Sequence, residues 1–215
     1  MIKIQVALDF TDEKNAMKMA SKICNMDNVM LEAGTPLIKA SGVSILRKLR
    51  ELCPGVELVA DMKIMDVGDI EAELAFKNGA DYTTVLGVAS RETIRKVIDV
   101  SRKFGARTIV DLIEVKDLEA FLRKIDGLKP DILCIHRGID VEISRCWDTG
   151  DIREIIKYLK DKVGSKIAVA GGITDKTAPT FIEAGADILV IGRYITRSKN
   201  PREAIKKVFQ SIGQK

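Results

Sequence analysis

The residues best suited to chemistry in this chain are an acid and a base two positions apart, Asp61 and Lys63, which follow the largely apolar run 56–60. In an extended segment such residues share a face, because side chains alternate along a strand. A carboxylate and an ammonium in one small pocket each perturb the pKa of the other, as catalytic groups require. Another acid, Asp66, follows before the amphipathic run 70–76. The alternative is a solvated loop with incidental charges.

The segments that must position these residues alternate between strand-like and helix-like patterns along the whole chain. Strand-like runs cover residues 2–8, 29–31, 56–60, 82–86, 107–110, 131–135, 166–170 and 188–191. Helix-like runs cover residues 13–23, 43–52, 68–78, 91–104, 118–125, 152–163, 177–184 and 201–212. Alternation of this kind predicts a parallel sheet. Eight units of about 27 residues predict an α/β fold, a single (β/α)8 TIM barrel domain over residues 1–215, with an open doubly wound sheet as the alternative.

An internal repeat supports the count of eight units. The segment 76–81 recurs as 181–187, and Gly79 and Gly185 stand 185 − 79 = 106 residues apart, close to the length of four units. We expect each glycine to end a helix in a left-handed turn. A repeat of four units is half a barrel.

Composition limits the class of protein. The chain has 215 residues, of which 31% are charged and 46% are apolar, which is typical of a globular protein. Its net charge of +4 suits the binding of an anionic small molecule. It has no long basic run, so we expect no nucleic-acid partner. We read no signal peptide and no membrane-spanning run, and therefore expect a cytoplasmic enzyme with no membrane partner. The cysteines lack metal or disulfide spacing and are Cys24, Cys53, Cys134 and Cys146.

Polar residues and glycines follow the predicted strands where their carboxyl ends would meet on one face of a barrel. Each alone could be a helix cap or a rim charge, but together they predict a pocket. These residues are Asp9, Glu32, Asp61, Lys63, Asp111, His136, Gly171, Gly172, Gly192 and Arg193.

The last two units have the features of a phosphate site. Gly171 and Gly172 allow backbone amides to approach an anion, and Gly192 with Arg193 adds a second such turn. Alternatively, these glycines only make tight turns. His136, the one histidine of the chain, could move protons near neutral pH or could be structural.

Glu32 and Asp61 end adjacent predicted strands. Two carboxylates facing one pocket form a minimal Mg²⁺ site, which water and substrate oxygens complete. A metal there would polarise a carbonyl and stabilise an enediolate.

The motif Asp61-x-Lys63-x-x-Asp66 resembles the signature of the orotidine 5′-monophosphate decarboxylase suprafamily. The resemblance runs from Gln5 to Arg193, which is nearly the whole chain. It implies a (β/α)8 barrel and a phosphorylated substrate.

Within that suprafamily, the chain most resembles the 3-hexulose-6-phosphate synthase family, in segments 32–42, 60–66 and 84–87. Glu32 stands where the orotidine 5′-monophosphate decarboxylases have a lysine, and the metal-dependent members of the suprafamily have glutamate there. The 3-keto-L-gulonate-6-phosphate decarboxylases are the alternative, because they share the main site residues and the pair His136-Arg137. The pair Asp111-Leu112 is more similar to the synthases.

The resemblance implies a reversible, Mg²⁺-dependent aldol reaction that joins formaldehyde and D-ribulose 5-phosphate to D-arabino-hex-3-ulose 6-phosphate. It assigns the metal to Glu32 and Asp61, a hydrogen bond to the enediolate oxygen to Lys63, and proton transfer to His136. A non-catalytic phosphosugar-binding barrel is the alternative from a different class.

The resemblance also implies substrate contacts and a partner. The catalytic set includes Asp66, which in this family reaches the site of the neighbouring subunit, so the expected partner is a second copy of the chain in a homodimer. The substrate contacts are expected from Asp9, Asp111, Gly171, Gly172, Gly192 and Arg193.

Overall fold

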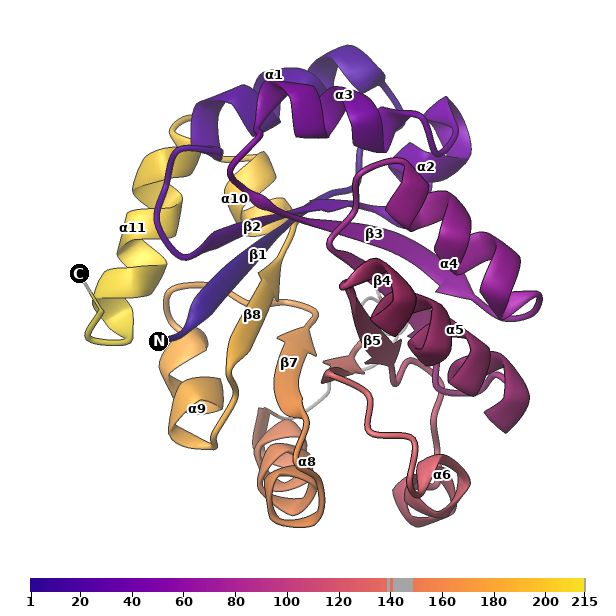
Figure 1. Cartoon of the computed structure of the whole chain (residues 1–215). Helices are drawn as coiled ribbons and strands as arrows, with labels where there is room; N and C mark the ends of the chain where they lie inside the picture. Colours follow the sequence, from indigo (N-terminus) through magenta and orange to yellow (C-terminus); the bar gives the residue numbers. More distant parts are fainter. Residues whose placement is uncertain (139, 141–148, 215) are drawn as a thin grey trace.

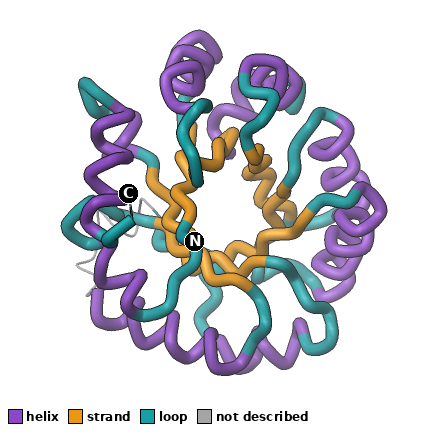
Figure 2. The backbone as a smooth tube through the Cα atoms, turned by 60° about the vertical axis from the view of Figure 1, so that its left-hand side comes forward, coloured by secondary structure: helices purple, strands orange, loops and turns teal. Residues whose placement is uncertain are grey.

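The computed structural model describes residues 1–138, 140 and 149–214, and it shows a closed barrel of eight parallel strands. The strands follow one another around the barrel in sequence order, and β1 closes it by pairing with β8. Helices surround the strands as an outer ring (Figures 1 and 2). The predicted (β/α)8 TIM barrel is confirmed.

The elements match the predicted ones to within a few residues at their ends. The strands are β1 (Lys3–Leu8), β2 (Val29–Ala33), β3 (Glu57–Ile64), β4 (Tyr82–Leu86), β5 (Arg107–Asp111), β6 (Ile132–His136), β7 (Lys166–Ala170) and β8 (Ile188–Ile191). The described helices are α1 (Glu13–Ile23), α2 (Thr35–Ser41), α3 (Ile45–Leu52), α4 (Gly68–Lys77), α5 (Arg91–Phe104), α6 (Leu118–Ile125), α8 (Thr149–Lys162), α9 (Ala178–Glu183), α10 (Arg193–Thr196) and α11 (Pro201–Ser211).

Two short helices differ from the predicted elements. Helix α2 lies between the predicted strand 29–31 and the predicted helix 43–52, and it has Pro36 in its first turn, where proline is well tolerated. This helix buries only Leu37, so it has no apolar periodicity for a sequence pattern to detect. Helix α10 is four residues long and follows β8 directly, and it was not predicted either.

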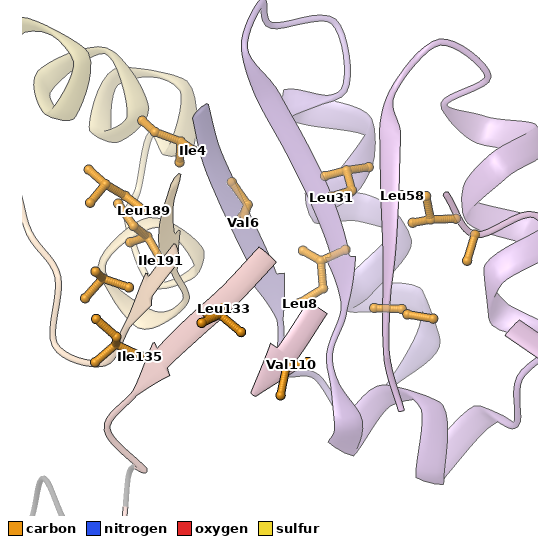
Figure 3. Close-up of a cluster of buried hydrophobic side chains, with 14 of the residues drawn as sticks. Ile4, Val6, Leu8, Leu31, Leu58, Val110, Leu133, Ile135, Leu189 and Ile191 are labelled. Atoms are coloured by element: carbon orange, nitrogen blue, oxygen red, sulfur yellow. The ribbon is translucent and has the colours of Figure 1, made fainter. Parts of the chain in front are cut away.

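Two apolar layers hold the barrel together, because successive strand residues point alternately outward and inward. The outward residues pack against the helices, and those labelled in Figure 3 come from β1, β2, β3, β5, β6 and β8. The inward residues fill the barrel interior and are Met30, Val59, Tyr82, Ile109, Ile132, Cys134, Ala168, Ala170 and Ile188. The barrel is therefore a packed core that leaves room for ligands only at its ends.

The internal repeat has a structural counterpart in both halves of the barrel. Gly79 and Gly185 have φ angles of +96° and +108°, which favour glycine. The aspartates two residues later make equivalent hydrogen bonds: Asp81 Oδ2 accepts from the amide of Leu58, and Asp187 Oδ2 from that of Ile167, both at 2.7 Å. Each repeat thus fastens the start of one strand to the chain entering the next.

No helix in the described part of the chain is long and apolar enough to cross a membrane. Cys24, Cys53 and Cys134 are free thiols, and Cys146 lies outside the described residues.

Candidate active site

The predicted site residues lie at or after the carboxyl ends of the barrel strands. The structure places Asp9 after β1, Glu32 in β2, Asp61 and Lys63 in β3, Asp111 and His136 at the ends of β5 and β6, Gly171 and Gly172 after β7, and Gly192 and Arg193 after β8. Because all eight strands are parallel, these ends meet at one face of the barrel.

A continuous chain of hydrogen bonds links four of these residues. Lys63 Nζ donates to Asp61 Oδ1 at 3.0 Å and to Asp111 Oδ2 at 2.8 Å. His136 Nδ1 lies 2.8 Å from the same Asp111 oxygen. Because an ionised carboxylate only accepts hydrogen bonds, Nδ1 carries the proton, and Nε2 is the ring nitrogen that can take up another.

Lys63 reaches Asp61 through an unusual backbone conformation. The register of β3 against β4 shifts between Ala60 and Ile64, and Lys63 has a φ of +48°, which is rare for residues other than glycine. The Lys63 amide donates to Thr84 Oγ1 at 2.8 Å, which holds the distorted segment. The predicted proximity of the acid and the base is confirmed, and so is its reason: Leu58, Ala60 and Ile64 belong to the outward cluster, so Asp61 and Lys63 share the inward face of β3.

The network keeps Asp111 and Lys63 in their ionised forms. Burial would raise the pKa of Asp111, but the hydrogen bond and charge of His136, together with Lys63, outweigh it and lower that pKa to about 2. Burial would lower the pKa of Lys63, but the charges of Asp61 and Asp111 outweigh it and raise that pKa. Lys63 is therefore a permanent cation in the pocket.

The surroundings of Glu32 and Asp9 disfavour the ionised forms of these two carboxyl groups. Burial raises the pKa of Glu32 well above its ordinary value, and the charges of Asp61 and Asp9 raise it further. Burial and the charge of Asp61 also raise the pKa of Asp9, against the opposing charges of Lys63, His136 and Arg193. Both carboxyl groups thus lie where one more positive charge would be stabilising.

These carboxylates fit a divalent cation with few protein ligands. Among the described residues, no group of three or more His, Cys, Asp or Glu side chains is arranged to hold a metal. Glu32 and Asp61 are each only 6% exposed and repel one another. A two-carboxylate site completed by water and substrate is the arrangement that their chemistry suits.

The predicted phosphate-binding turns have the backbone that close approach requires. Gly171 and Gly172 have φ angles of +109° and +64°. A Cβ atom on Gly171 would lie 2.7 Å from the carbonyl oxygen of Arg137, so no larger residue fits. Gly192 precedes α10, which begins at Arg193, so a helix amino terminus and a guanidinium adjoin the same turn.

Asp66 is not part of the buried network. Its exposed carboxylate accepts a hydrogen bond from the amide of Val67 at 2.8 Å, and no hydrogen bond or ion pair joins it to the pocket within the described residues. Four large apolar side chains near it in the sequence are exposed: Met65, Val67, Ile70 and Leu74 are 53%, 46%, 58% and 44% exposed.

Comparison with known proteins places this geometry in a family. Residues 3–208 match the orotidine 5′-phosphate decarboxylase / HUMPS family. The chain belongs to this family. A relative named bifunctional enzyme Fae/Hps, from Methanoculleus marisnigri, is 39% identical over 210 residues, which are 98% of this chain and 52% of the relative. The chain thus spans about half the length of the curated relatives it matches.

Solved structures of this family superpose closely. A 3-hexulose-6-phosphate synthase from Salmonella typhimurium has a TM-score of 0.90 and 34% identity, over 98% of each chain. KGPDC from Streptococcus mutans, in a ligand complex, has a TM-score of 0.91 and 25% identity, over 99% of this chain and 97% of that one.

Three hydrogen-bonding residues of this family member were not predicted from the sequence. Thr35 Oγ1 lies 2.7 Å from Asp61 Oδ2, and Thr84 Oγ1 donates to Asp61 Oδ1 at 2.8 Å. Gln5 Nε2 donates to Glu32 Oε2 at 2.5 Å. Only Gln5 had a detectable signal: it is a polar residue within an apolar strand, on the face that leads to Asp9.

Proposed function

We propose that the chain is a 3-hexulose-6-phosphate synthase, an aldolase that reversibly joins formaldehyde and D-ribulose 5-phosphate to D-arabino-hex-3-ulose 6-phosphate. The observation that carries the proposal is the buried Asp61–Lys63–Asp111–His136 network, with Glu32 beside it. The similarity to a synthase structure over its full length supports the same reaction.

The network provides what an aldol reaction through an enediolate needs. His136 Nε2 would take a proton from C1 of the ketose, while Asp111 holds the ring by Nδ1. The ammonium of Lys63 would donate a hydrogen bond to the oxygen on which negative charge develops at C2. Carbon C1 then forms a bond to the formaldehyde carbon, and His136 returns the proton to the formaldehyde oxygen.

Glu32 and Asp61 would hold Mg²⁺, with water and substrate oxygens as the remaining ligands. When bound, the ion would supply Lewis-acid stabilisation of the charge on the enediolate. Thr35 and Thr84 orient the Asp61 carboxylate from both sides, which limits the directions in which it can bind a ligand.

The substrate would lie between the metal carboxylates and the last two strands. We assign its phosphate to Gly171, Gly172, Gly192 and Arg193. The glycine backbone permits close approach there, and α10 starts at the same turn. Asp9 and Asp111 would position sugar hydroxyls.

We also propose a homodimer in which Asp66 completes the partner's site. Asp66 lies outside the network of its own chain, and the segment that carries it exposes large apolar side chains, as expected for a surface that another molecule covers. Mixing chains that carry Asp66→Asn with chains that carry Lys63→Ala tests this. Heterodimers would contain one intact site, so partial activity is expected, and no recovery would contradict sharing.

The proposed reaction is tested by assaying one preparation for two activities, the synthase reaction and the decarboxylation of 3-keto-L-gulonate 6-phosphate. We expect condensation of formaldehyde with D-ribulose 5-phosphate, loss of activity with EDTA and recovery with Mg²⁺. Activity that survives complete metal removal would overturn the roles given to Glu32 and Asp61. The control is Lys63→Ala, which should be inactive with or without Mg²⁺.

Decarboxylation of 3-keto-L-gulonate 6-phosphate is the second candidate, because the pair His136-Arg137 resembles those decarboxylases and the KGPDC structure superposes equally well. The same assay separates the two reactions by product. Binding of the phosphosugar without turnover of either substrate would instead support a non-catalytic barrel.

A further inference from the structure

Gln5 is the polar residue beneath the carboxylate pair. It lies on β1 and pairs with Met30 of β2. Glu32 pairs with Ala7, so it lies one inward-facing layer nearer the carboxyl ends of the strands than Gln5 does. The side chain of Gln5 is 3% exposed and adjoins the apolar interior of the barrel. Its amide nitrogen nevertheless reaches Glu32 Oε2 at 2.5 Å.

The amide of Gln5 is only half satisfied. Its Oε1 atom is buried and has no hydrogen-bond partner among the described residues, which is unfavourable for a polar atom among apolar side chains. Turning the amide over would bring Oε1 against Glu32 in the form that binds a cation, which is ionised and can only accept hydrogen bonds. An apolar residue at position 5 would avoid the unpaired atom. A purely structural role therefore does not account for Gln5.

We propose that Gln5 is a positioning residue for a divalent cation, because it fixes one oxygen of Glu32 and directs the other toward the ion. This inference rests on the proposed Glu32–Asp61 metal site. Glutamate has three rotatable side-chain bonds, so without an anchor its carboxylate could turn away from Asp61, whose charge repels it. The hydrogen bond from Gln5 holds Glu32 in the pocket before the cation arrives. Partners of this kind commonly contribute about 10–100-fold to metal affinity.

The test is the affinity of the metal-free protein for Mn²⁺, measured from the electron paramagnetic resonance signal of the free ion. Gln5→Met keeps the size of the side chain and removes both polar atoms. We expect it to bind Mn²⁺ about 10–100-fold more weakly than the wild type. Gln5→Asn keeps the amide but shortens the side chain, so it should also weaken binding, and it serves if the methionine variant does not fold.

Two control variants distinguish a failure of the role given to Gln5 from a failure of the proposed metal site. Thr108→Val removes a buried hydroxyl that hydrogen-bonds to Ser101 at 2.6 Å and not to Glu32 or Asp61. It should leave Mn²⁺ affinity unchanged. Glu32→Gln should abolish binding. If Glu32→Gln abolishes binding but folded Gln5 variants match the wild type, the role of Gln5 is overturned and the metal site stands. If Glu32→Gln binds like the wild type, the metal site fails, and this inference with it.

Discussion

Asp111→Asn is the substitution that most directly tests the network. Asp111 Oδ1 accepts from the amide of Ile113 at 2.9 Å, and Oδ2 faces both Lys63 and His136. In the variant, the amide oxygen would stay with the Ile113 amide, so the new NH₂ group would face two donors. Both partners would thus lose Asp111 as an acceptor, although the side chain keeps its shape and Lys63 keeps its hydrogen bond to Asp61.

The loss of stability can be estimated from the pKa of Asp111. A value lowered from 3.8 to about 2 corresponds to about 2 kcal/mol of stabilisation at pH 7. The side chain is 3% exposed, so solvent does not screen this contribution. Because the folded pKa lies below the unfolded one, the stabilisation is complete above the unfolded pKa and is lost as the pH falls through the folded pKa. About half of it should remain at pH 3.

Urea unfolding of the wild type and Asp111→Asn at pH 7 and pH 3 measures this effect. We expect the variant to be less stable by about 2 kcal/mol at pH 7, and the difference to shrink by about 1 kcal/mol at pH 3. Asp99→Asn, which removes an exposed partner of Arg95, should change stability by less than about 0.5 kcal/mol at either pH. If the wild type and Asp111→Asn differ in stability by the same amount at both pH values, the lowered pKa assigned to Asp111 is refuted. The variant should also lose about 10²–10⁴-fold in kcat, since His136 is no longer held.

Three further substitutions test the surroundings of the network. Thr84→Val should lower kcat/KM about tenfold, with a measurable loss of Mn²⁺ affinity, because Asp61 loses a donor at 2.8 Å. Gly34→Ala should impair turnover in steady-state assays, because the new Cβ would lie 2.1 Å from Asp9 Oδ1 and displace that carboxylate. Arg193→Met should raise KM for the phosphosugar about 10–100-fold with little change in kcat, if the guanidinium binds phosphate equally in the ground and transition states.

The sequence was sufficient to predict the barrel and most of the pocket for one reason. Parallel strands that alternate with helices must bring their carboxyl ends together, so polar residues at those ends converge without any knowledge of distances. Asp61, Asp111 and His136 were predicted in this way. The structure joins Asp61 to Asp111 through Lys63, and His136 to Asp111 directly.

What the sequence could not predict depends on local distortion or on single side-chain contacts. The φ of +48° at Lys63 follows from a register shift that no periodicity reveals. Thr84 resembles any strand-forming threonine, and Thr35 lies outside the predicted strands and helices, so their hydrogen bonds to Asp61 appear only once the strands are in register. Short elements such as α2 and α10 contribute too few apolar residues to be recognised.

The charges of the pocket support the proposed metal-dependent reaction at the glutamate of β2. Lys63 is within electrostatic reach of Asp61, Asp111 and Glu32, but its hydrogen bonds go to the two aspartates. Glu32 accepts a hydrogen bond from the neutral amide of Gln5, and its pKa is raised, as is that of Asp9. A substrate phosphate would add further negative charge to this pocket. A divalent cation beside Glu32 and Asp61 would remove the repulsion, and it would leave Lys63 to stabilise the negative charge that forms on the substrate.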